Sequence, residues 1–303
     1  MKILLRPRLC SEALAHRLAS DPRLAAALGP EPNSAVGYLF KKFVDAAGPL
    51  LARVLEHARA EGEQMSFLRD VQFSAGEIAA ASHLEVVCRK TIGQSDAESR
   101  ATLADYDADA LHPTAGRWRV RLPRRMFLGK PVPPDTIAHV DQYTGEYVLG
   151  QKAADALRAS ALQGWELQPV LHWKTLRPEP GVGMHLTTRA LLPEALQCAS
   201  TFEAHDDGPA APGTPRRYGA LSYARDALDG SPDFARTAEP WCDWSTPQWV
   251  VRQRVRTWHE QAGLRGWAFR PVLLEGTPLQ REHEERWSAV LAQLRAGGAD
   301  IAA

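Results

Sequence analysis

LQGWELQPV (residues 162–170) is matched 102 residues later in the chain by LRGWAFRPV (residues 264–272). Extending both stretches toward the N-terminus aligns residues 147–171 with residues 249–273 without a gap, and eight of the 25 aligned residues are identical. Several other aligned pairs are conservative, such as Tyr with Trp at the first position and Lys with Arg at the sixth. We therefore interpret the chain as containing an internal repeat.

Each copy of the repeat has the same local pattern. It begins with an aromatic and aliphatic stretch that is typical of a strand (EYVLG, QWVVR), continues with a helical segment, and ends in a second strand that finishes with Pro-Val-Leu. Gly164 and Gly266 stand before the second strand, where glycine permits the positive φ that often ends a helix. The pattern predicts one strand-helix-strand unit near residues 146–171 and another near residues 248–273.

The second strand of each unit has an informative composition. Trp165 or Trp267 begins an alternation of residues that is typical of a half-buried strand, which predicts both tryptophans in the core. Pro169 and Pro271 cannot donate a backbone hydrogen bond, so we expect each of them at a sheet edge, a bulge or a strand end. Such a unit builds a sheet covered by helices and does not by itself define a chemistry.

The N-terminal part of the chain has mostly helical patterns. Ser11 can cap a helix whose apolar residues recur at helical spacing until Gly29 and the proline after it. Residues 36–62 predict one or two further helices, and Gly48 with Pro49 is the expected break between them.

Strand patterns are found before and after these helices. MKILLRPRLC at the start of the chain predicts a strand. Ser74 and Glu77 have the spacing of a capping box, which predicts a short helix. HLEVVCRKTI (residues 83–92) and WRVRLPRRMFL (residues 118–128) are enriched in β-branched or aromatic residues and predict two strands.

The composition of GKPVPPD (residues 129–135) predicts a domain boundary, because three of its seven residues are proline. A chain of 303 residues is long enough for two domains of ordinary size. We expect an N-terminal domain of helices and strands at residues 1–130 and a C-terminal domain with both repeat units at residues 131–303. The predicted fold class is α+β, with helices and strands mixed.

Composition and charge exclude several classes of protein. Hydrophobic residues make up 45% of the chain and charged residues 24%, as in folded soluble proteins. Lys plus Arg and Asp plus Glu each number 36, so no overall field attracts nucleic acid or an anionic membrane. No stretch approaches the roughly 20 apolar residues that span a bilayer. We expect a soluble, cytoplasmic protein without a membrane or nucleic-acid partner.

The common signatures of enzymes and metal sites are missing. The four cysteines lie far apart and form no CxxC, so neither zinc nor dithiol chemistry is indicated. The pair His259-Glu260 lacks the second histidine of a zinc protease helix. An enzyme with a dispersed active site remains an alternative, for which Asp141, His172 and His185 are the candidate residues.

Two clusters of residues are candidates for binding a partner. WCDWSTPQW (residues 241–249) holds three tryptophans in nine residues; these can anchor an interface, although a core with one polar edge explains them equally well. RLPRRM (residues 121–126) is the densest basic run and can face an acidic surface or a phosphate, while protection of a sheet edge is the commoner role. The residues predicted to bind a partner are Trp241, Trp244, Arg121, Arg124 and Arg125.

The repeated phrase resembles the C-terminal module of immunity proteins from bacterial polymorphic toxin systems. It is most similar to the DUF1629-type immunity proteins and to the double-CxxCG type found in myxobacterial swarming-inhibition toxin loci. The resemblance covers residues 248–276 and, similarly, residues 147–173, which together are under a quarter of the chain. The chain has no CxxCG, so the zinc-binding feature implied for the second group is not carried over.

This resemblance implies a protein without catalysis that binds a cognate toxin and blocks its active site or assembly. Such recognition relies on exposed charged and aromatic residues that match one partner. We therefore expect a non-enzymatic immunity protein, or antitoxin, whose partner is a protein toxin and which needs no cofactor or metal. The alternatives are the enzyme with a dispersed site, which a deep cleft with converging titratable groups would favour, and a scaffold protein.

Overall fold

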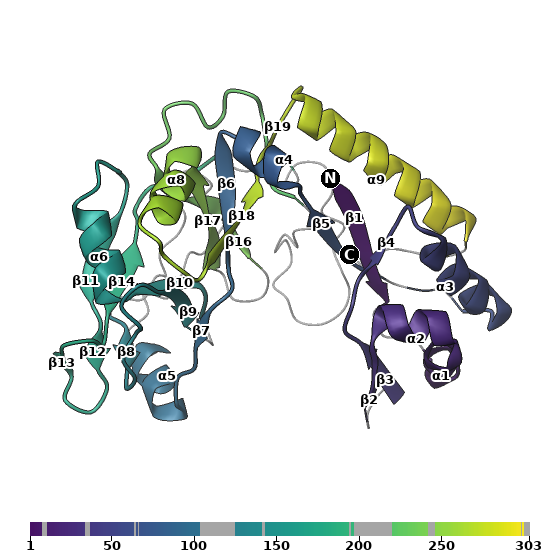
Figure 1. Cartoon of the computed structure of the whole chain (residues 1–303), viewed down its shortest axis with the longest axis horizontal. Helices are drawn as coiled ribbons and strands as arrows, with labels where there is room; N and C mark the ends of the chain where they lie inside the picture. The colour runs from purple at the N-terminus through teal and green to yellow at the C-terminus, as the bar shows by residue number, and fades with distance from the viewer. Residues whose placement is uncertain are drawn as a thin grey trace. The chain divides into compact units, whose positions relative to one another are not determined.

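The computed structural model describes residues 1–7, 11–33, 37–63, 65, 67–103, 125–140, 143–193, 195–196, 220–241, 246–297 and 299. Helices and several separate sheets alternate along the chain, so the fold is α+β, as predicted (Figure 1). The chain forms two compact units. The first comprises Met1–Glu77, Gly276–Ala303 and a short segment at Ala220, and the second comprises Ile78–Arg217 and Leu221–Glu275.

This division differs from a boundary near residue 130 for two physical reasons. The last helix, α9 (Pro278–Ala296), returns to the N-terminal residues, because its Val290 and Leu294 are buried in the same apolar cluster as Leu5. Strand β6 (His83–Cys88) lies in one sheet with the strands of the second repeat unit, although it precedes residue 130 in the chain. Neither of these long-range contacts leaves a local signal in the sequence.

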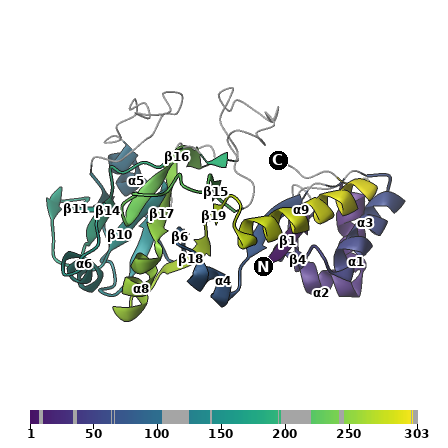
Figure 2. The same ribbon diagram turned by 90° about the horizontal axis from the view of Figure 1, so that it is seen from above.

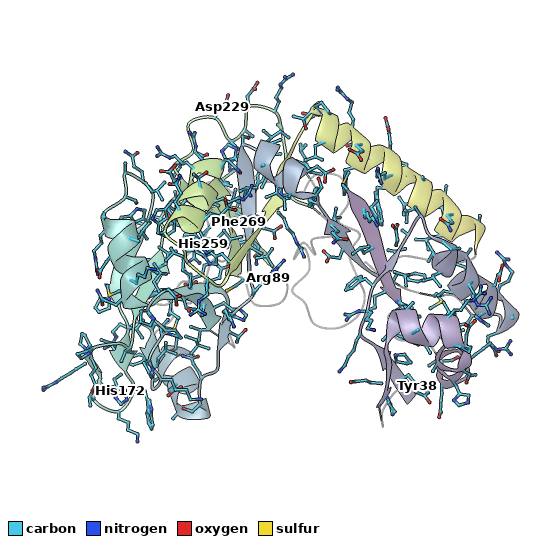
Figure 3. The ribbon with its side chains drawn as sticks, in the orientation of Figure 1. Tyr38, Arg89, His172, Asp229, His259 and Phe269 are labelled. Atoms are coloured by element: carbon cyan, nitrogen blue, oxygen red, sulfur yellow. The ribbon has the colours of Figure 1, made fainter. Side chains whose placement is uncertain are left out.

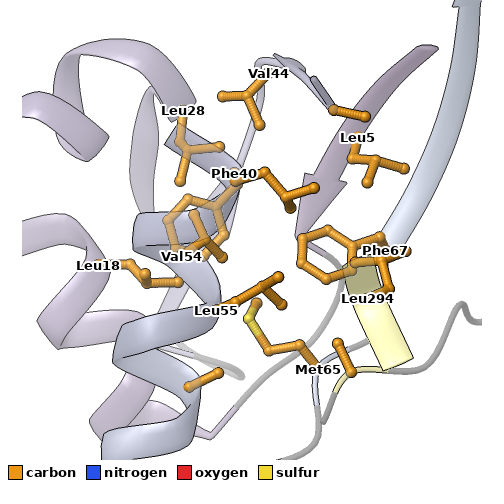
Figure 4. Close-up of a cluster of buried hydrophobic side chains, with 14 of the residues drawn as sticks. Leu5, Leu18, Leu28, Phe40, Val44, Val54, Leu55, Met65, Phe67 and Leu294 are labelled. Carbon is orange, nitrogen blue, oxygen red and sulfur yellow. The ribbon is translucent and has the colours of Figure 1, made fainter. Parts of the chain in front are cut away.

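The first unit is a small sheet packed against helices. In the sheet, β1 (Lys2–Pro7) lies between β4 (Val44–Asp45) and β5 (Phe67–Gln72) and is antiparallel to both. The other elements are α1 (Glu12–Ser20), α2 (Pro22–Leu28), the hairpin of β2 (Pro30–Asn33) and β3 (Gly37–Phe40), α3 (Pro49–Ala60) and α9. Their apolar side chains form the core shown in Figure 4, which includes Leu18, Val54 and Phe67.

Local hydrogen bonds explain where these helices begin. Ser11 caps α1 as predicted, because its Oγ accepts a hydrogen bond from the backbone N–H of Leu14 at 3.2 Å. The expected single helix is divided in two, because Asp21 accepts hydrogen bonds from the N–H groups that follow it and starts α2. The helix predicted before Gly48 was wrong: Gly37–Phe40 is a strand paired with Pro30–Asn33.

The second unit contains two copies of one module, and the module is larger than the sequence repeat. The first copy consists of β8 (Phe127–Leu128), β9 (Ile137–Val140), β10 (Tyr143–Leu149), α6 (Gln151–Arg158), β11 (Glu166–Pro169) and β12 (Leu171–His172). The second copy has the same order: β15 (Ser222–Tyr223), β16 (Phe234–Trp241), β17 (Thr246–Arg252), α8 (Gln253–Gln261), β18 (Trp267–Pro271) and β19 (Leu273–Leu274). The two predicted strand-helix-strand units are confirmed as β10-α6-β11 and β17-α8-β18.

In each module an antiparallel strand lies between the two strands of the repeat. Strand β14 (Met184–Thr187) separates β10 from β11, and β6 separates β17 from β18. The register is also the same, because the aligned residues Val148 and Val250 pair with His185 and Glu85, respectively. The inserted strand follows the first module in the chain but precedes the second.

Four further short elements lie in the described part of this unit. They are α4 (Ala75–Ala80), which ends in this unit, β7 (Thr91–Ile92), α5 (Asp96–Leu103) and β13 (Arg177–Pro178). Ser74 and Glu77 exchange the hydrogen bonds of a capping box before α4, as predicted.

The equivalence of the modules extends to the short parallel strands at their ends. Strand β8 pairs with β12, and β15 pairs with β19. The N–H of Leu171 donates to the carbonyl of Met126 at 2.9 Å, and the aligned N–H of Leu273 donates to that of Leu221 at 2.7 Å. The structural repeat therefore extends well beyond the 25 aligned residues of the sequence.

The two modules contact each other through equivalent residues. Tyr147 and Trp249 are aligned in the repeat, and their ring centroids lie 5.9 Å apart in a core that both modules share. The indole N–H of Trp258 in α8 donates to the carbonyl of Ala156, its aligned residue in α6, at 3.2 Å. Helices α6 and α8 are neighbours in both views (Figures 1 and 2). An approximate two-fold axis therefore relates the modules.

Gly164 and Gly266 lie where each module touches the other. Their φ angles are +87° and +110°, so the predicted positive φ is confirmed, but neither residue ends a helix, because both stand just before the returning strand. A Cβ at Gly164 would lie 2.6 Å from the carbonyl oxygen of Phe234, at the start of β16. A Cβ at Gly266 would overlap the carbonyl oxygen of Ile137, at the start of β9. Both contacts require glycine.

The other predicted packing positions can be compared with the structure. Trp267 is buried in the shared core, as predicted, whereas Trp165 is only half-buried. Pro169 and Pro271 are the last residues of β11 and β18, which are edge strands of their sheets, as predicted. The sheet that contains β10 and the sheet that contains β17 each have a second face, turned away from the shared core, which packs in an apolar cluster of its own. Both faces of each sheet therefore contain buried aliphatic residues.

We predict that Gly266→Ala destabilises the protein much more than Gly263→Ala. Gly263 also has a positive φ, +61°, but a Cβ there would meet nothing within 4 Å, so its replacement costs only about 1 kcal/mol of backbone strain. Gly266→Ala adds a clash between two backbones and should cost at least about 3 kcal/mol. Urea unfolding of both variants measures the difference, and equal losses would contradict the proposed backbone contact.

Candidate functional site

Most residues that were predicted to bind a partner lie outside the described part of the chain. This applies to Arg121, Arg124 and Trp244, and for Trp241 only the backbone is described, at the end of β16. Arg125 is exposed, and its guanidinium carbon lies 5.7 Å from the centroid of the aromatic ring of β8. The partner-binding role of these residues therefore stays a prediction.

The candidate residues of the enzyme alternative do not form one described site. Asp141 lies outside the described residues, while His172 and His185 belong to β12 and β14, which are strands of different sheets. His172 lies 3.6 Å from a carboxylate oxygen of Glu179. His185 belongs to a buried cluster of charged groups.

This cluster, formed by Glu146, His185 and Arg236, connects the two modules. The guanidinium group of Arg236, from the second module, donates two hydrogen bonds to the carboxylate of Glu146 in the first, at 2.7 and 3.1 Å. Nε2 of His185 lies 2.7 Å from the same carboxylate, and the Arg236 guanidinium carbon lies 4.6 Å from the centroid of the Trp249 ring. The side chains of Glu146 and Arg236 are 0% exposed and that of His185 is 1% exposed, so a substrate cannot reach them.

The electrostatics of the cluster favour a charged carboxylate. Burial alone raises the pKa of Glu146, but the positive charge of Arg236 and the hydrogen bonds from His185 and Arg236 outweigh burial and lower the pKa to about 2. The carboxylate therefore adds stability at any pH above its ordinary pKa of 4.5, and this stability is lost as the pH falls through about 2. We interpret the cluster as a structural connection between the modules.

We predict that Glu146→Gln destabilises the protein by about 3–5 kcal/mol, because it leaves the Arg236 charge buried without a counter-charge. The double variant Glu146→Leu/Arg236→Met removes both charges and should lose clearly less. Chemical unfolding of both variants at neutral pH measures the two losses. A double variant that is less stable than Glu146→Gln would contradict this account of the cluster.

A second polar cluster contains a serine and a histidine that sequence reasoning did not connect. Nε2 of His83, at the start of β6, lies 3.1 Å from Oγ of Ser231, which is in the loop before β16. The two residues are separated by 148 positions, so no sequence spacing could reveal the contact. A hydroxyl beside an imidazole is the starting geometry of nucleophilic catalysis, so the other partners of the pair decide its role.

Those partners do not match a catalytic arrangement. Nδ1 of His83 lies 3.1 Å from Oγ of Ser82, so a hydroxyl occupies the place of the carboxylate that orients the base in a catalytic triad. Burial and then the positive charge of Arg252 lower the pKa of His83 to about 4, and Asp229 opposes them only in part. A general base that works near neutral pH needs a pKa close to that pH. The geometry favours a structural role for the pair.

We predict that the free energy of unfolding decreases as the pH falls from about 6.5 toward 4. The pKa of His83 is 6.5 in the unfolded chain and about 4 in the folded protein, so in this range the unfolded state binds the proton more readily. Urea unfolding across this range measures the slope, and His83→Gln should reduce it. The pKa of His259 is lowered as well, so part of the slope should remain in the variant. An unchanged slope in His83→Gln would contradict the prediction.

The most unusual exposed feature is the hairpin of β12 and β13, which begins with the last strand of the first module. Strands β12 and β13 are joined by a loop of four residues, at the lower left of Figure 1, and Figure 3 labels His172 at its base. The N–H of Leu176 donates to the carbonyl of His172 at 2.8 Å, and Oγ1 of Thr175 donates to Oε1 of Glu179 at 2.7 Å. These bonds hold the loop in a defined conformation.

Leu176 has a backbone conformation that leucine rarely adopts. Its φ is +56°, and among the described residues every other positive φ belongs to a glycine. For a side chain with a Cβ this conformation costs roughly 1–2 kcal/mol. Leu176 is also 59% exposed, and it is the only large hydrophobic residue in the described ranges that is exposed. An exposed side chain gains little from packing, so the stability of the fold does not explain leucine here.

Cationic residues stand close to this leucine in the chain or beside its neighbour Trp173. The ring of Trp173 lies beside Gly129, because a Cβ there would be 2.7 Å from its Cδ1, and Nζ of Lys174 is 5.5 Å from the ring centroid. Lys130 and Arg177 are exposed, and neither forms an ion pair within the part of the chain that the structure describes. We call Lys130, Trp173, Lys174, Leu176 and Arg177 the hairpin tip.

The hairpin is also the place where the two modules diverge. After β19 of the second module the chain turns at Gly276 and Thr277, and Thr277 caps α9. Lys174 and Leu176 thus stand where the second copy has Gly276 and Pro278. The positions that pack the modules are shared by both copies, whereas the hairpin belongs to one copy. The module fold therefore does not require it.

No model of a known protein family matches the chain, and no curated protein matches it. Among the residues that the structure describes, no three His, Cys, Asp or Glu side chains come together in a way that could hold a metal ion. None of the described helices is long and apolar enough to cross a membrane. We take the hairpin tip as the candidate functional site, because backbone strain, exposure of an apolar side chain and positive charge coincide there.

Proposed function

We propose that the chain is a non-enzymatic immunity protein that acts in the cytoplasm, where it binds a cognate bacterial toxin and neutralises it. The observation that carries the proposal is Leu176, an exposed leucine with a positive φ that stands close in the chain to the exposed residues Lys174 and Arg177. Strained backbone is concentrated at binding and catalytic sites, because elsewhere selection removes it. Glycine adopts this conformation without strain, so a leucine at this position indicates a role other than folding.

The environments of the buried titratable groups also support binding over catalysis. Glu146, Arg236 and His185 bind one another in the interior. The carboxylate of Asp233, which is 0% exposed, is held by the side chain of Arg254 and by the backbone N–H of Gln163 at 2.6 Å. These groups serve the packing of the modules and are not open to a substrate.

The resemblance to toxin immunity proteins adds a third, independent support. The residues that carry it, such as Trp267, Pro271 and their copies in the first module, occupy core and edge positions of the two sheets. They are therefore markers of a module fold. Recognition of the toxin then depends on surfaces that the repeat does not include.

The test is co-expression of this chain with the product of the gene beside its own, with growth as the measurement. We predict that the neighbouring product arrests growth alone, that this chain restores growth, and that the two form a stoichiometric complex. The variant Ser231→Ala leaves the hairpin tip unchanged and, at a temperature where it is folded, should restore growth equally well, because Ser231 has a structural role in this proposal. No complex and no rescue would contradict the proposed function.

One outcome would favour the enzyme alternative. If Ser231→Ala unfolds like the wild type but no longer restores growth, the contact between Ser231 and His83 has a chemical role after all. His83→Gln should then abolish rescue as well, since the serine would have lost its base. A complex that persists in both variants would separate lost catalysis from lost binding.

A further inference from the structure

We infer that the hairpin tip docks on an acidic protein surface and that Leu176 fills an apolar pocket in that surface. The inference deepens the proposed function and rests on it for the statement that the partner is a toxin. The chemistry of the partner is argued from the hairpin alone. The hairpin has three relevant features: a preformed loop, an exposed leucine and a group of exposed cations.

The loop is preformed by contacts within the hairpin. The N–H of Leu176 donates a hydrogen bond to the carbonyl of His172, which closes the loop. The hydroxyl of Thr175 donates one to Glu179, which ties the loop to the residue that follows β13. The ring of Trp173, the first residue of the loop, lies against Gly129. Binding therefore orders few additional groups, and preformed loops bind more tightly for that reason. The strain at Leu176 is already present before the partner arrives.

The charges of the hairpin tip indicate the charge of its partner. Lys130, Lys174 and Arg177 are exposed. Among the described residues, the carboxylate of Glu98 is buried and accepts a hydrogen bond from the N–H of Ser95. Glu179 keeps its negative charge, although it accepts a hydrogen bond from Thr175. The three exposed cations outnumber it, so the hairpin has a net positive charge beside its exposed leucine. Interfaces combine a desolvated centre with a polar rim of complementary charge, so the matching surface has carboxylates around an apolar pocket.

Two other classes of partner fit these residues less well. A single exposed leucine is too little apolar surface for stable attachment to a membrane, even with cations beside it. Nucleic-acid binding of single strands uses open aromatic rings on which bases stack. The only aromatic ring of the hairpin tip, Trp173, is half-buried, with Gly129 beside it and Lys174 near its ring. A protein surface is the partner that uses both the leucine and the cations.

The first experiment selects peptides from a random library displayed on phage, with the full chain as bait. We expect enriched peptides that combine several Asp or Glu residues with one large apolar residue. Their affinity should fall at least about tenfold for Leu176→Gly, as for the loss of a residue at the centre of an interface. It should fall similarly for Lys174→Glu/Arg177→Glu. Arg158→Glu, an exposed reversal on α6, is the control and should bind like the wild type.

The variant Leu176→Gly distinguishes a role of Leu176 in binding from a role in the stability of the fold. Glycine adopts a positive φ without strain, so this variant should be as stable as the wild type or more stable. A structural role for Leu176 predicts the opposite, a loss of stability. Urea unfolding of the variant decides between the two, and a clear loss of stability overturns the inference.

Three further outcomes would overturn the inference. These are enrichment of no peptide, enrichment of peptides that bind Leu176→Gly as well as the wild type, and enrichment of peptides without acidic residues. Vesicles made of equal parts phosphatidylcholine and phosphatidylserine test the membrane alternative by co-sedimentation. Binding to them that Leu176→Gly abolishes would assign the hairpin to a lipid surface instead.

The same variants distinguish this inference from the proposed function. If the wild type rescues growth from the neighbouring gene product and Leu176→Gly rescues equally well, the docking role of the hairpin is overturned and the immunity function stands. If no rescue occurs but acidic peptides bind through Leu176, the docking surface stands and the immunity function fails.

Discussion

The arrangement of the second unit depends on two places where backbone meets backbone. At Gly164 the loop of the first module lies against the start of β16, and at Gly266 the loop of the second lies against the start of β9; the absence of a side chain lets the backbones approach. The backbone N–H groups of Phe234 and Ile137 donate to Gln163 and Arg265 at these same places, at 3.2 and 2.8 Å. The aromatic core between the modules, with Tyr147 and Trp249 near the two-fold axis, is possible because these contacts bring the sheets together.

The buried ion pair departs from this symmetry. Glu146 of the first module is aligned with Gln248 of the second, and Arg236 is opposite Trp249 in the same register in which His139 is opposite Tyr147. The pair of Glu146 and Arg236 can therefore form on one side of the axis and not on the other. This charge pair is therefore one of the features that distinguish two modules with nearly the same packing. We expect this buried pair to contribute mainly to a unique arrangement of the two modules.

The sequence predicted what is local and repeated. The strand-helix-strand units, the cap at Ser11 and the edge positions of Pro169 and Pro271 follow from spacing and residue type alone, and the structure confirms them. The sequence could not predict that β6 lies between two strands that come much later in the chain, or that α9 returns to the N-terminal core. Such long-range contacts leave no periodic pattern in the sequence. The candidate site was missed for a related reason. Leu176 is an ordinary residue by type, and only its φ angle makes it unusual.

Because of the position of β6, the strands of the two similar modules are synthesised in different orders. A chain leaves the ribosome from its N-terminal end, so β6 is made long before β17 and β18, between which it finally lies. The first module is complete once β14, at Met184–Thr187, has been made, because all of its strands are then present. The second module cannot close until β17 and β18 pair with β6, and contacts of such long separation form slowly. The finished first module is thus available as a surface on which the second can assemble during translation.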